Sequence, residues 1–247
     1  MSSSGGIAVC AVTPDASAVA AQSRPPDRTV VAEPGGAGPR TAILAAATTG
    51  ADWLWVLGEG VDPDRDALAE LLAPLGDLPA LGDPVLFSSK VVGPDGRMDP
   101  DALPWPRLLA RELAMAGADH RLAALRAARA GSLLVERRAV ERHGPPRADF
   151  AATGGDLEWT GRLLRDDPGY VVPRSLAVRR SAGGAAPDVS TFTRERVRIL
   201  RGDGWRGQEK AWFAFLLAQD LVQRGAARPA GAGRLARAVV QGLRAPA

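Results

Sequence analysis

The chain has 247 residues, which is enough for one large α/β domain or two small ones, and its 46% of hydrophobic residues excludes wholesale disorder. Its 31 Lys and Arg exceed its 28 Asp and Glu by only three charges, and we find no interleaving of aromatic and basic residues of the kind that stacks nucleic-acid bases. One cysteine, Cys10, excludes an internal disulfide and a thiolate metal cluster, and two histidines are too few for a His-rich metal site.

The first half of the chain alternates between strand-like and helix-like segments. The expected strands are GIAVCAV (Gly6–Val12), TVVAE (Thr29–Glu33), DWLWVLG (residues 52–58) and PVLFSSKVVG (Pro84–Gly93). Between them we expect one or two helical turns, a helix over Arg40–Ala51 that stops at Gly50, and a helix that begins with Asp62 as its N-cap and Pro63 in its first turn. This alternation predicts a mostly parallel sheet covered by helices.

The second half is predicted to be richer in helix. Residues Leu103–Arg129 are rich in Ala, Leu and Arg and predict one or two helices, and a strand follows over Gly131–Arg137. A short helix then closes at Gly144, another begins near Asp156, and Tyr170–Arg180 reads as a strand. The remaining segments are helical, and the last two carry an apolar stripe with arginines on the other face. We therefore expect an α/β domain over residues 1–183 and a C-terminal helical region over residues 184–247 that packs on it.

A loop with one acid between two glycines follows the third expected strand. Ligands of open α/β sheets bind at the carboxyl ends of the strands, and acids placed there can hold a hard cation that bridges nucleotide phosphates. Two carboxylates are usual for that task, whereas Gly58, Glu59 and Gly60 supply one. The competing interpretation is an ordinary strand-to-helix turn with capping acids, and the spacing alone favours that interpretation.

Two further groups of residues are candidates for chemistry. In GGDLEW, Asp156 at a helix N-terminus could act as general base on a hydroxyl with Glu158 beneath it, or the two acids could simply cap the helix. In VVPRSLAVRR, Arg174, Arg179 and Arg180 flank a strand end, and guanidinium groups match phosphate oxygens. The alternative for these arginines is a solvated basic edge.

Taken in order, five segments from about Gly6 to Arg180 make the chain resemble a family 2 glycosyltransferase with a GT-A fold. The closest similarity is to the galactofuranosyl and rhamnosyl transferase-like branch, and it covers the C-terminal helices more loosely. The resemblance implies a Rossmann-like, mostly parallel sheet flanked by helices, with a C-terminal helical extension. It rests on the order and spacing of RPPDRTVVAEPGG, ADWLWVLGEGVDPDRDALAELL, KVVGPDGR, AGSLLVERRAVERHGPP and DFAATGGDLEWTGRLLRDDPGYVVPRSLAVR.

The resemblance also implies roles for matched positions. Glu33 falls where an acid contacts the base or ribose of the nucleotide, Asp156 on the acid that deprotonates the acceptor, and Glu158 on the acid two positions further on. The metal-binding loop of the family reads D-x-D or D-D-D. Here the outer positions are Gly58 and Gly60, so the motif is degenerate.

The departures from the family pattern concern the donor site. Arg179 replaces a metal-binding histidine, and the first loop is shortened. The resemblance therefore implies no divalent cofactor bound in the family's manner, with Glu59 as the ligand of any Mn²⁺ or Mg²⁺.

Two functions are compatible with these departures. In the first, the chain is a metal-independent, inverting hexosyltransferase of cell-wall or polysaccharide biosynthesis, in which Arg179 neutralises the leaving diphosphate. Its partners would be a nucleotide-diphosphate sugar and a glycan or lipid-linked acceptor, and not nucleic acid. In the second, the chain is an inactive relative that binds a partner. A third class, a dinucleotide-binding oxidoreductase suggested by PGGAGP (Pro34–Pro39), fails because this segment follows the second strand and Pro39 breaks the glycine pattern.

The sequence predicts a cytoplasmic location. The N-terminus lacks the basic region of a signal peptide, and no apolar run is long enough to cross a bilayer. The arginine-rich C-terminal helices nevertheless offer peripheral contact with an anionic membrane surface at its inner face, near a lipid-linked acceptor. Packing of the same helices on the catalytic sheet is the competing interpretation.

Overall fold

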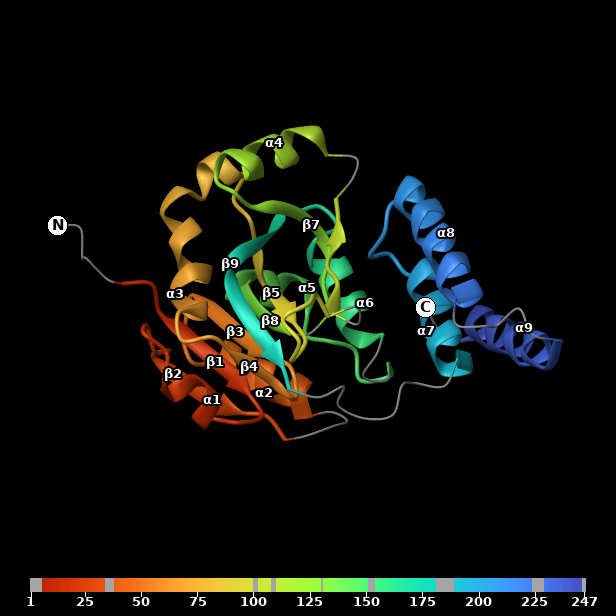
Figure 1. Cartoon of the computed structure of the whole chain (residues 1–247), viewed down its shortest axis with the longest axis horizontal. Helices are drawn as coiled ribbons and strands as arrows, with labels where there is room; N and C mark the ends of the chain where they lie inside the picture. The colour runs from red at the N-terminus through yellow and green to blue at the C-terminus, as the bar shows by residue number, and fades with distance from the viewer. Residues whose placement is uncertain are drawn as a thin grey trace.

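The computed structural model describes residues 6–33, 38–99, 102–107, 110–129, 131–150, 154–180, 189–223 and 229–245. A twisted sheet occupies the middle of the molecule, and the C-terminal helices stand together along one side of it (Figure 1). Within the described residues, none of the helices is both long and apolar enough to span a bilayer.

The sheet has the order β2-β1-β3-β8-β5-β9-β7-β6, with β4 paired to β9 outside this path. Strands β2, β1, β3, β5 and β9 run in one direction, because the parallel pairs β1–β2, β1–β3 and β5–β9 are linked through β8, which is antiparallel to both β3 and β5. The sheet is therefore largely parallel, as expected. The strands are β1 (Val9–Thr13), β2 (Arg28–Val31), β3 (Trp53–Leu57), β4 (Val61–Pro63), β5 (Leu86–Val92), β6 (Trp105–Pro106), β7 (Ala123–Ala127), β8 (Ser132–Glu136) and β9 (Gly169–Arg179).

Helices cover both faces of the sheet, which is why β1 and β3 are buried along their whole length. Leu54 and Val56 of β3 pack in one core with side chains of α2, α5 and α6, whereas Trp53 and Trp55 pack in the other with side chains of α3. Trp53 and Trp55 therefore share one face of the sheet, as residues two positions apart on a strand do. The helices are α1 (Ser17–Ala20), α2 (Gly38–Ala47), α3 (Ala67–Leu72), α4 (Arg111–Asp119), α5 (Arg137–His143), α6 (Gly155–Leu163), α7 (Val189–Arg201), α8 (Gly207–Gln223) and α9 (Pro229–Arg244).

The prediction that Asp62 caps a helix is wrong. Residues Val61–Pro63 form β4, which pairs antiparallel with residues 177–179 of β9, and α3 begins only at Ala67. The exposed edge of β9 offers backbone hydrogen bonds to this segment, and these outweigh the local helix-start signal.

The helical prediction for Leu103–Arg129 is correct only in its middle. Helix α4 lies between the short strands β6 and β7, and β7 pairs with β9 through Ala123 and Ala124. Ala, Leu and Arg favour a helix locally, but pairing with a neighbouring strand overrides that weak preference.

The C-terminal helices contact the sheet layer through an apolar cluster. Phe213 of α8 and Ile199 of α7 pack with Ala127 and Leu157, and Trp205 in the turn between the two helices completes the cluster. Beside the cluster, the buried guanidinium group of Arg126 on β7 donates to Glu209 on α8. This contact brings α8 against the same side of the molecule as β7 (Figure 1).

Candidate functional site

The strand ends that the sequence singles out lie at one edge of the sheet. The parallel register places Thr13 opposite Val31 and Val12 opposite Val56, so the loops after β1, β2 and β3 leave the sheet side by side. The end of β9 joins them, because the Arg180 backbone N–H donates to the carbonyl oxygen of Gly60 at 3.0 Å. This edge is where open α/β sheets bind ligands.

The Gly58–Gly60 loop forms a tight turn that leaves its acid in solvent. The backbone N–H of Gly58 donates to the carbonyl oxygen of Gly131 at 2.9 Å. Gly60 adopts a φ of +68°, a conformation that residues with a Cβ rarely adopt. Glu59 between them is exposed. Among the described residues, no group of three or more His, Cys, Asp or Glu is placed to hold a metal ion. Within the part of the chain that the structure describes, the side chains at this loop therefore do not match the carboxylate set that a divalent metal needs.

Glu33 is also exposed at this edge, just after β2. A Cβ on Gly38, where α2 begins, would lie only 2.0 Å from the carbonyl oxygen of Glu33, so the chain returns very close to the strand end. The loop between them, residues 34–37, lies outside the described residues, as does most of the PGGAGP segment.

Two arginines at the end of β9 have different environments. The Nε of Arg179 lies 2.8 Å from Oδ2 of Asp99, and both side chains are largely buried. Arg180 forms an ion pair with Asp62 but keeps 76% of its side chain exposed. Asp99 therefore neutralises part of the positive charge of Arg179, the residue expected to replace the metal. Arg180 is the more accessible of the two cations.

Asp156 lies in the first turn of α6. The N-cap of α6 is Gly154, so Asp156 is not the N-cap residue of this helix. The side chain is half-buried. The dipole of α6 favours a negative charge in the first turn, and a carboxylate is the form that accepts a proton.

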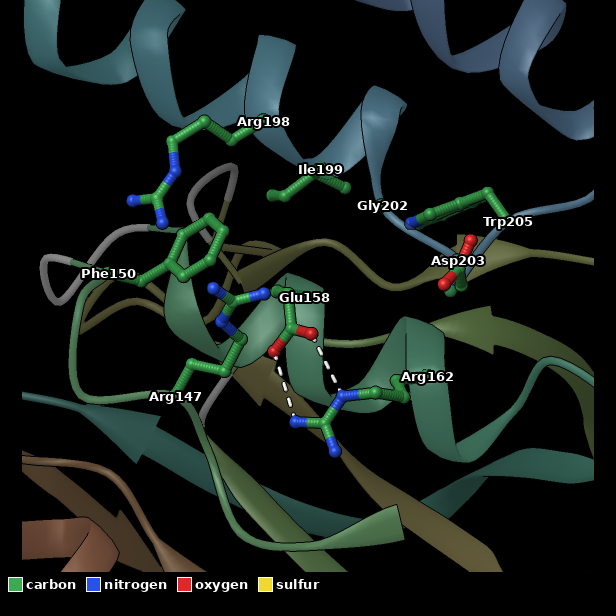
Figure 2. Close-up of a pocket in the computed structure, with 10 residues that line it drawn as sticks. Arg147, Phe150, Glu158, Arg162, Arg198, Ile199, Gly202, Asp203 and Trp205 are labelled. Carbon is green, nitrogen blue, oxygen red and sulfur yellow. Dashed lines mark hydrogen bonds and ion pairs between the residues drawn. The ribbon is translucent and has the colours of Figure 1, made fainter. Parts of the chain in front are cut away.

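Glu158 does not share a cleft with Asp156. Its two carboxylate oxygens accept from Arg162 Nε at 2.9 Å and from Arg162 Nη2 at 3.2 Å, one turn along α6 (Figure 2). Its carboxylate lines a cavity of about 160 Å³ between α6 and α7, whose described lining does not include Asp156. The structure thus brings Glu158 to a different face of the helix, as expected for residues two positions apart.

Several residues of this cavity carry no signal in the sequence. Arg147 and Phe150 come from the loop before α6, Arg198 from α7, and Trp205 from the turn before α8. Figure 2 shows Arg147 beside Glu158, Phe150 next to Arg198, and Trp205 on the opposite side of the view. They are separated by up to 58 positions from Arg147 to Trp205, and only the packing of α7 beside α6 brings them together.

A second hollow is a wider, mainly apolar groove of about 530 Å³ between β6 and α8. Its walls include Trp105 and Trp205 on one side and Trp212 and Phe215 on the other. The Trp212 and Phe215 rings stack with centroids 5.5 Å apart, although the two residues are 42% and 58% exposed. Exposed aromatic side chains beside an apolar groove indicate a contact surface.

Comparison with known proteins shows the fold but not a sequence family. No family model and no curated protein matches this chain. Staphylococcus aureus TarS 1–349 in complex with UDP-GlcNAc is similar with a TM-score of 0.64 and 9% identity, over 96% of this chain and 81% of that one. Another crystal structure of the same fragment, S. aureus TarS 1–349, gives a TM-score of 0.57 at 10% identity, over 94% of this chain and 81% of that one. S. aureus TarS gives 0.56 at 8% identity, over 87% of this chain and 43% of that one. The expected α/β fold of the GT-A type is thereby confirmed.

Proposed function

We propose that this protein is an inverting glycosyltransferase that moves a sugar from a nucleotide-diphosphate donor to a hydroxyl group of a glycan or lipid-linked acceptor. The observation that carries the proposal is the position of Asp156, a half-buried acid in the first turn of α6, within a fold shared with a protein crystallised with UDP-GlcNAc. At 9% sequence identity, the similarity to that protein supports the fold only. The proposed chemistry depends on the carboxylate of Asp156.

The transfer we propose is a single in-line displacement. The acceptor oxygen attacks the anomeric carbon, Asp156 takes the hydroxyl proton, and the bond from that carbon to the diphosphate oxygen breaks, which inverts the configuration. The nucleoside diphosphate leaves with the additional negative charge. We propose that Arg179 and its neighbour Arg180 stabilise that charge in place of a metal, and that Glu33 and the Gly58–Gly60 loop contact the donor.

One observation favours the second candidate, an inactive relative that serves as a binding module. Asp99 lies against Arg179, so part of the charge proposed to replace the metal is already neutralised. The two candidates differ in whether the strand-end edge binds a nucleotide at all.

Calorimetric titration with uridine and thymidine diphosphates, with and without Mn²⁺, tests this difference. We expect binding that Mn²⁺ leaves unchanged and that Arg179→Ala weakens about tenfold or more, because a hydrogen bond to a charged group contributes about 1.5–3 kcal/mol. Asp99→Asn should strengthen binding, because it releases Arg179. Arg174→Ala is the matched control, since it removes the same charge from an exposed position on the same strand.

Each result of the titration has a defined consequence. Binding that requires Mn²⁺ would overturn the metal-independent mechanism. Absence of binding by both nucleotides under either condition would remove the transferase proposal and leave the binding module. An equal loss in Arg174→Ala would show that the effect of Arg179 is one of general charge.

We also propose peripheral contact of the C-terminal helices with an anionic membrane, which would place the enzyme near a lipid-linked acceptor. Trp212 and Phe215 on α8 and Val240 and Leu243 on α9 are exposed apolar side chains, and α9 also carries Arg237 and Arg244. Apolar side chains together with arginines are the combination that holds a helix at a charged lipid surface.

A further inference from the structure

The cavity between α6 and α7, which we call the Glu158 cavity, contains a buried donor that has no partner. The indole Nε1–H of Trp205 makes no hydrogen bond within the described residues, although Trp205 is only 4% exposed. Figure 2 shows the ring nitrogen turned toward the cavity. A buried donor without an acceptor costs about 1–3 kcal/mol. A ligand oxygen in the cavity that accepts a hydrogen bond from this N–H would remove that cost.

Neighbouring groups hold the indole ring of Trp205 in one orientation. Its ring lies against Gly161 of α6, where a Cβ would be 3.0 Å from the indole nitrogen, so a residue other than glycine would push the ring away. The guanidinium carbon of Arg126 lies over the Trp205 ring, 4.3 Å from its centroid. The indole N–H is therefore held in one direction and cannot turn to find another acceptor.

The charges around the cavity cancel. Arg147 and Arg198 both pair with Asp149, Arg162 pairs with Glu158, and the carboxylate of Asp203 also lines the wall. The three guanidinium groups of the lining are thus matched by the carboxylates of Glu158 and Asp203 in the lining and by that of Asp149, which lies outside it. A phosphate or sulfate would meet these carboxylates as like charges, whereas hydroxyl groups can accept from the guanidinium and indole groups and donate to the carboxylates.

The size of the cavity limits the ligand to one ring. A volume of about 160 Å³ is roughly ten times the 10–15 Å³ that a single buried water needs, which suits a molecule of on the order of ten heavy atoms. Phe150 and Trp205 supply flat apolar walls, and the polar groups lie between them. Small-molecule sites combine apolar walls with a few convergent polar groups in this way.

We propose that the Glu158 cavity binds one uncharged, hydroxyl-rich sugar ring, as a subsite for a unit of the acceptor glycan beside the unit that Asp156 activates. The role of this cavity as an acceptor subsite rests on the proposed transferase function. The choice of an uncharged sugar as its ligand rests only on the residues of the cavity. Glu158 and Arg162 are then acceptor-binding groups, and Trp205 donates to a ring hydroxyl.

Nuclear magnetic resonance of the wild-type protein labelled with ¹⁵N at its indole groups tests the proposal. The probes are the methyl glycosides of glucose, galactose, N-acetylglucosamine and rhamnose, together with inorganic phosphate as the anionic probe. We expect at least one glycoside to shift the Trp205 indole N–H resonance and phosphate not to shift it. Trp205→Phe should weaken binding of that glycoside about fivefold, the loss of one neutral hydrogen bond. Trp212→Phe, outside this cavity, should leave it unchanged.

Two results would overturn the proposal: a shift of the Trp205 resonance by phosphate that equals or exceeds the shift by every glycoside, or no shift by any glycoside up to its solubility limit. The wild-type measurement does not depend on whether Trp205→Phe folds. Uridine diphosphate, titrated separately, distinguishes the two proposals. Glycoside binding without nucleotide binding would keep the sugar site and remove the transferase, and nucleotide binding without glycoside binding would do the reverse.

Discussion

Asp156 and Glu158 are two residues apart on α6, but their surroundings suit them to different tasks. Glu158 accepts hydrogen bonds from two guanidinium nitrogens of Arg162, whereas Asp156 lies in the first turn of α6 and is outside the lining of the Glu158 cavity. The sequence and the family resemblance could predict both acids and the helix that carries them. They could not predict the cavity that Glu158 lines, because its other walls, from α7 and Trp205, are set by tertiary packing.

Asp156→Asn should lower kcat by a factor of about 10²–10⁴, the usual contribution of a positioned general base, and should leave the affinity for the nucleotide unchanged. Glu158→Gln makes the same chemical change on the same helix and should raise the KM for acceptor more than it lowers kcat. Steady-state kinetics and calorimetry measure the two effects. If Glu158→Gln abolishes turnover and Asp156→Asn does not, the base has been assigned to the wrong acid.

Asp149 makes the region before α6 sensitive to acid. Hydrogen bonds from Arg147, and then from Arg198, lower the pKa of Asp149 to about 2 from its usual 3.8. A carboxyl group whose pKa is lower in the folded state contributes stability above its unfolded pKa, and that stability is lost as the pH falls through the folded pKa. We expect this loss between about pH 4 and pH 2. The Asp149 side chain is 45% exposed, so solvent screening limits the contribution to about 1 kcal/mol or less.

Urea unfolding of Asp149→Asn across this range checks the expectation. The variant should be less stable than wild type at neutral pH, and the difference should vanish near pH 2. Asp119→Asn, at an exposed position on α4, is the control and should change stability by no more than about 0.5 kcal/mol. A difference between Asp149→Asn and wild type that persists at pH 2 would show that packing, and not the ion pairs, is responsible.

Among the elements, those with a strong local pattern could be predicted and those made by pairing could not. The run WLWVL predicts a buried strand because both of its faces are apolar, and β3 is that strand. Strands β4, β6 and β7 are two to five residues long, and their existence depends on neighbours that lie far along the chain, such as β9 for β4. Short segments of this kind have no periodicity to detect.

Among the α8 side chains that the structure describes, Phe213 lies in the core and other apolar ones lie in solvent. Phe213 is fully buried, whereas Trp212 and Phe215 are exposed next to the apolar groove. If this face rests on a membrane, the double variant Trp212→Ser with Phe215→Ser should lose at least about tenfold in binding to vesicles that contain anionic lipid. Each aromatic contributes about 1.5–3 kcal/mol when fully inserted, and about 1.4 kcal/mol is a factor of ten, so partial insertion of the pair is sufficient. Vesicle sedimentation gives the measurement.

The control for this prediction is an exposed apolar residue far from α8. Leu44→Ser on α2 should leave vesicle binding unchanged. Wild-type protein that does not bind anionic vesicles more strongly at low salt than at high salt would rule out the membrane contact. The exposed aromatics would then have to be explained by a protein partner.

For the whole molecule, the resemblance predicted the GT-A type of fold from segments in the first 180 residues. The C-terminal helices were predicted to pack on that domain, but the sequence gives no residues that would make the contact. Their position follows from contacts such as Phe213 with Trp105, whose ring centroids are 4.6 Å apart. Because both cavities have walls from this region, the candidate subsites exist only when residues 189–223 pack on the sheet layer. Variants at the junction between the C-terminal helices and the sheet layer therefore test whether this packing holds the two regions together.

Arg126 and Glu209 form the buried ion pair of this junction. Arg126 Nε and Nη2 donate to the two carboxylate oxygens of Glu209 at 2.7 and 2.9 Å, and Nη1 donates to the carbonyl oxygen of Gly161 at 2.8 Å. Burial alone would raise the pKa of Glu209, but hydrogen bonds from Arg126 and from the Arg206 backbone N–H outweigh it and lower the pKa. The pair is therefore charged, and it links β7 and α6 to α8.

Removing one partner leaves a buried charge without compensation. The Arg126 side chain is only 3% exposed, so Glu209→Gln should lower the free energy of unfolding by about 3 kcal/mol, which urea denaturation measures. The double variant Arg126→Met with Glu209→Leu should recover most of this loss, because an apolar pair of similar volume carries no desolvation cost. Asp166→Asn provides the matched control: it breaks the exposed Arg206–Asp166 pair, at 2.7 Å and about 60% exposure, and should cost less than about 1 kcal/mol. If Glu209→Gln is as mild as this control, the C-terminal helices are held by the apolar cluster around Phe213 alone.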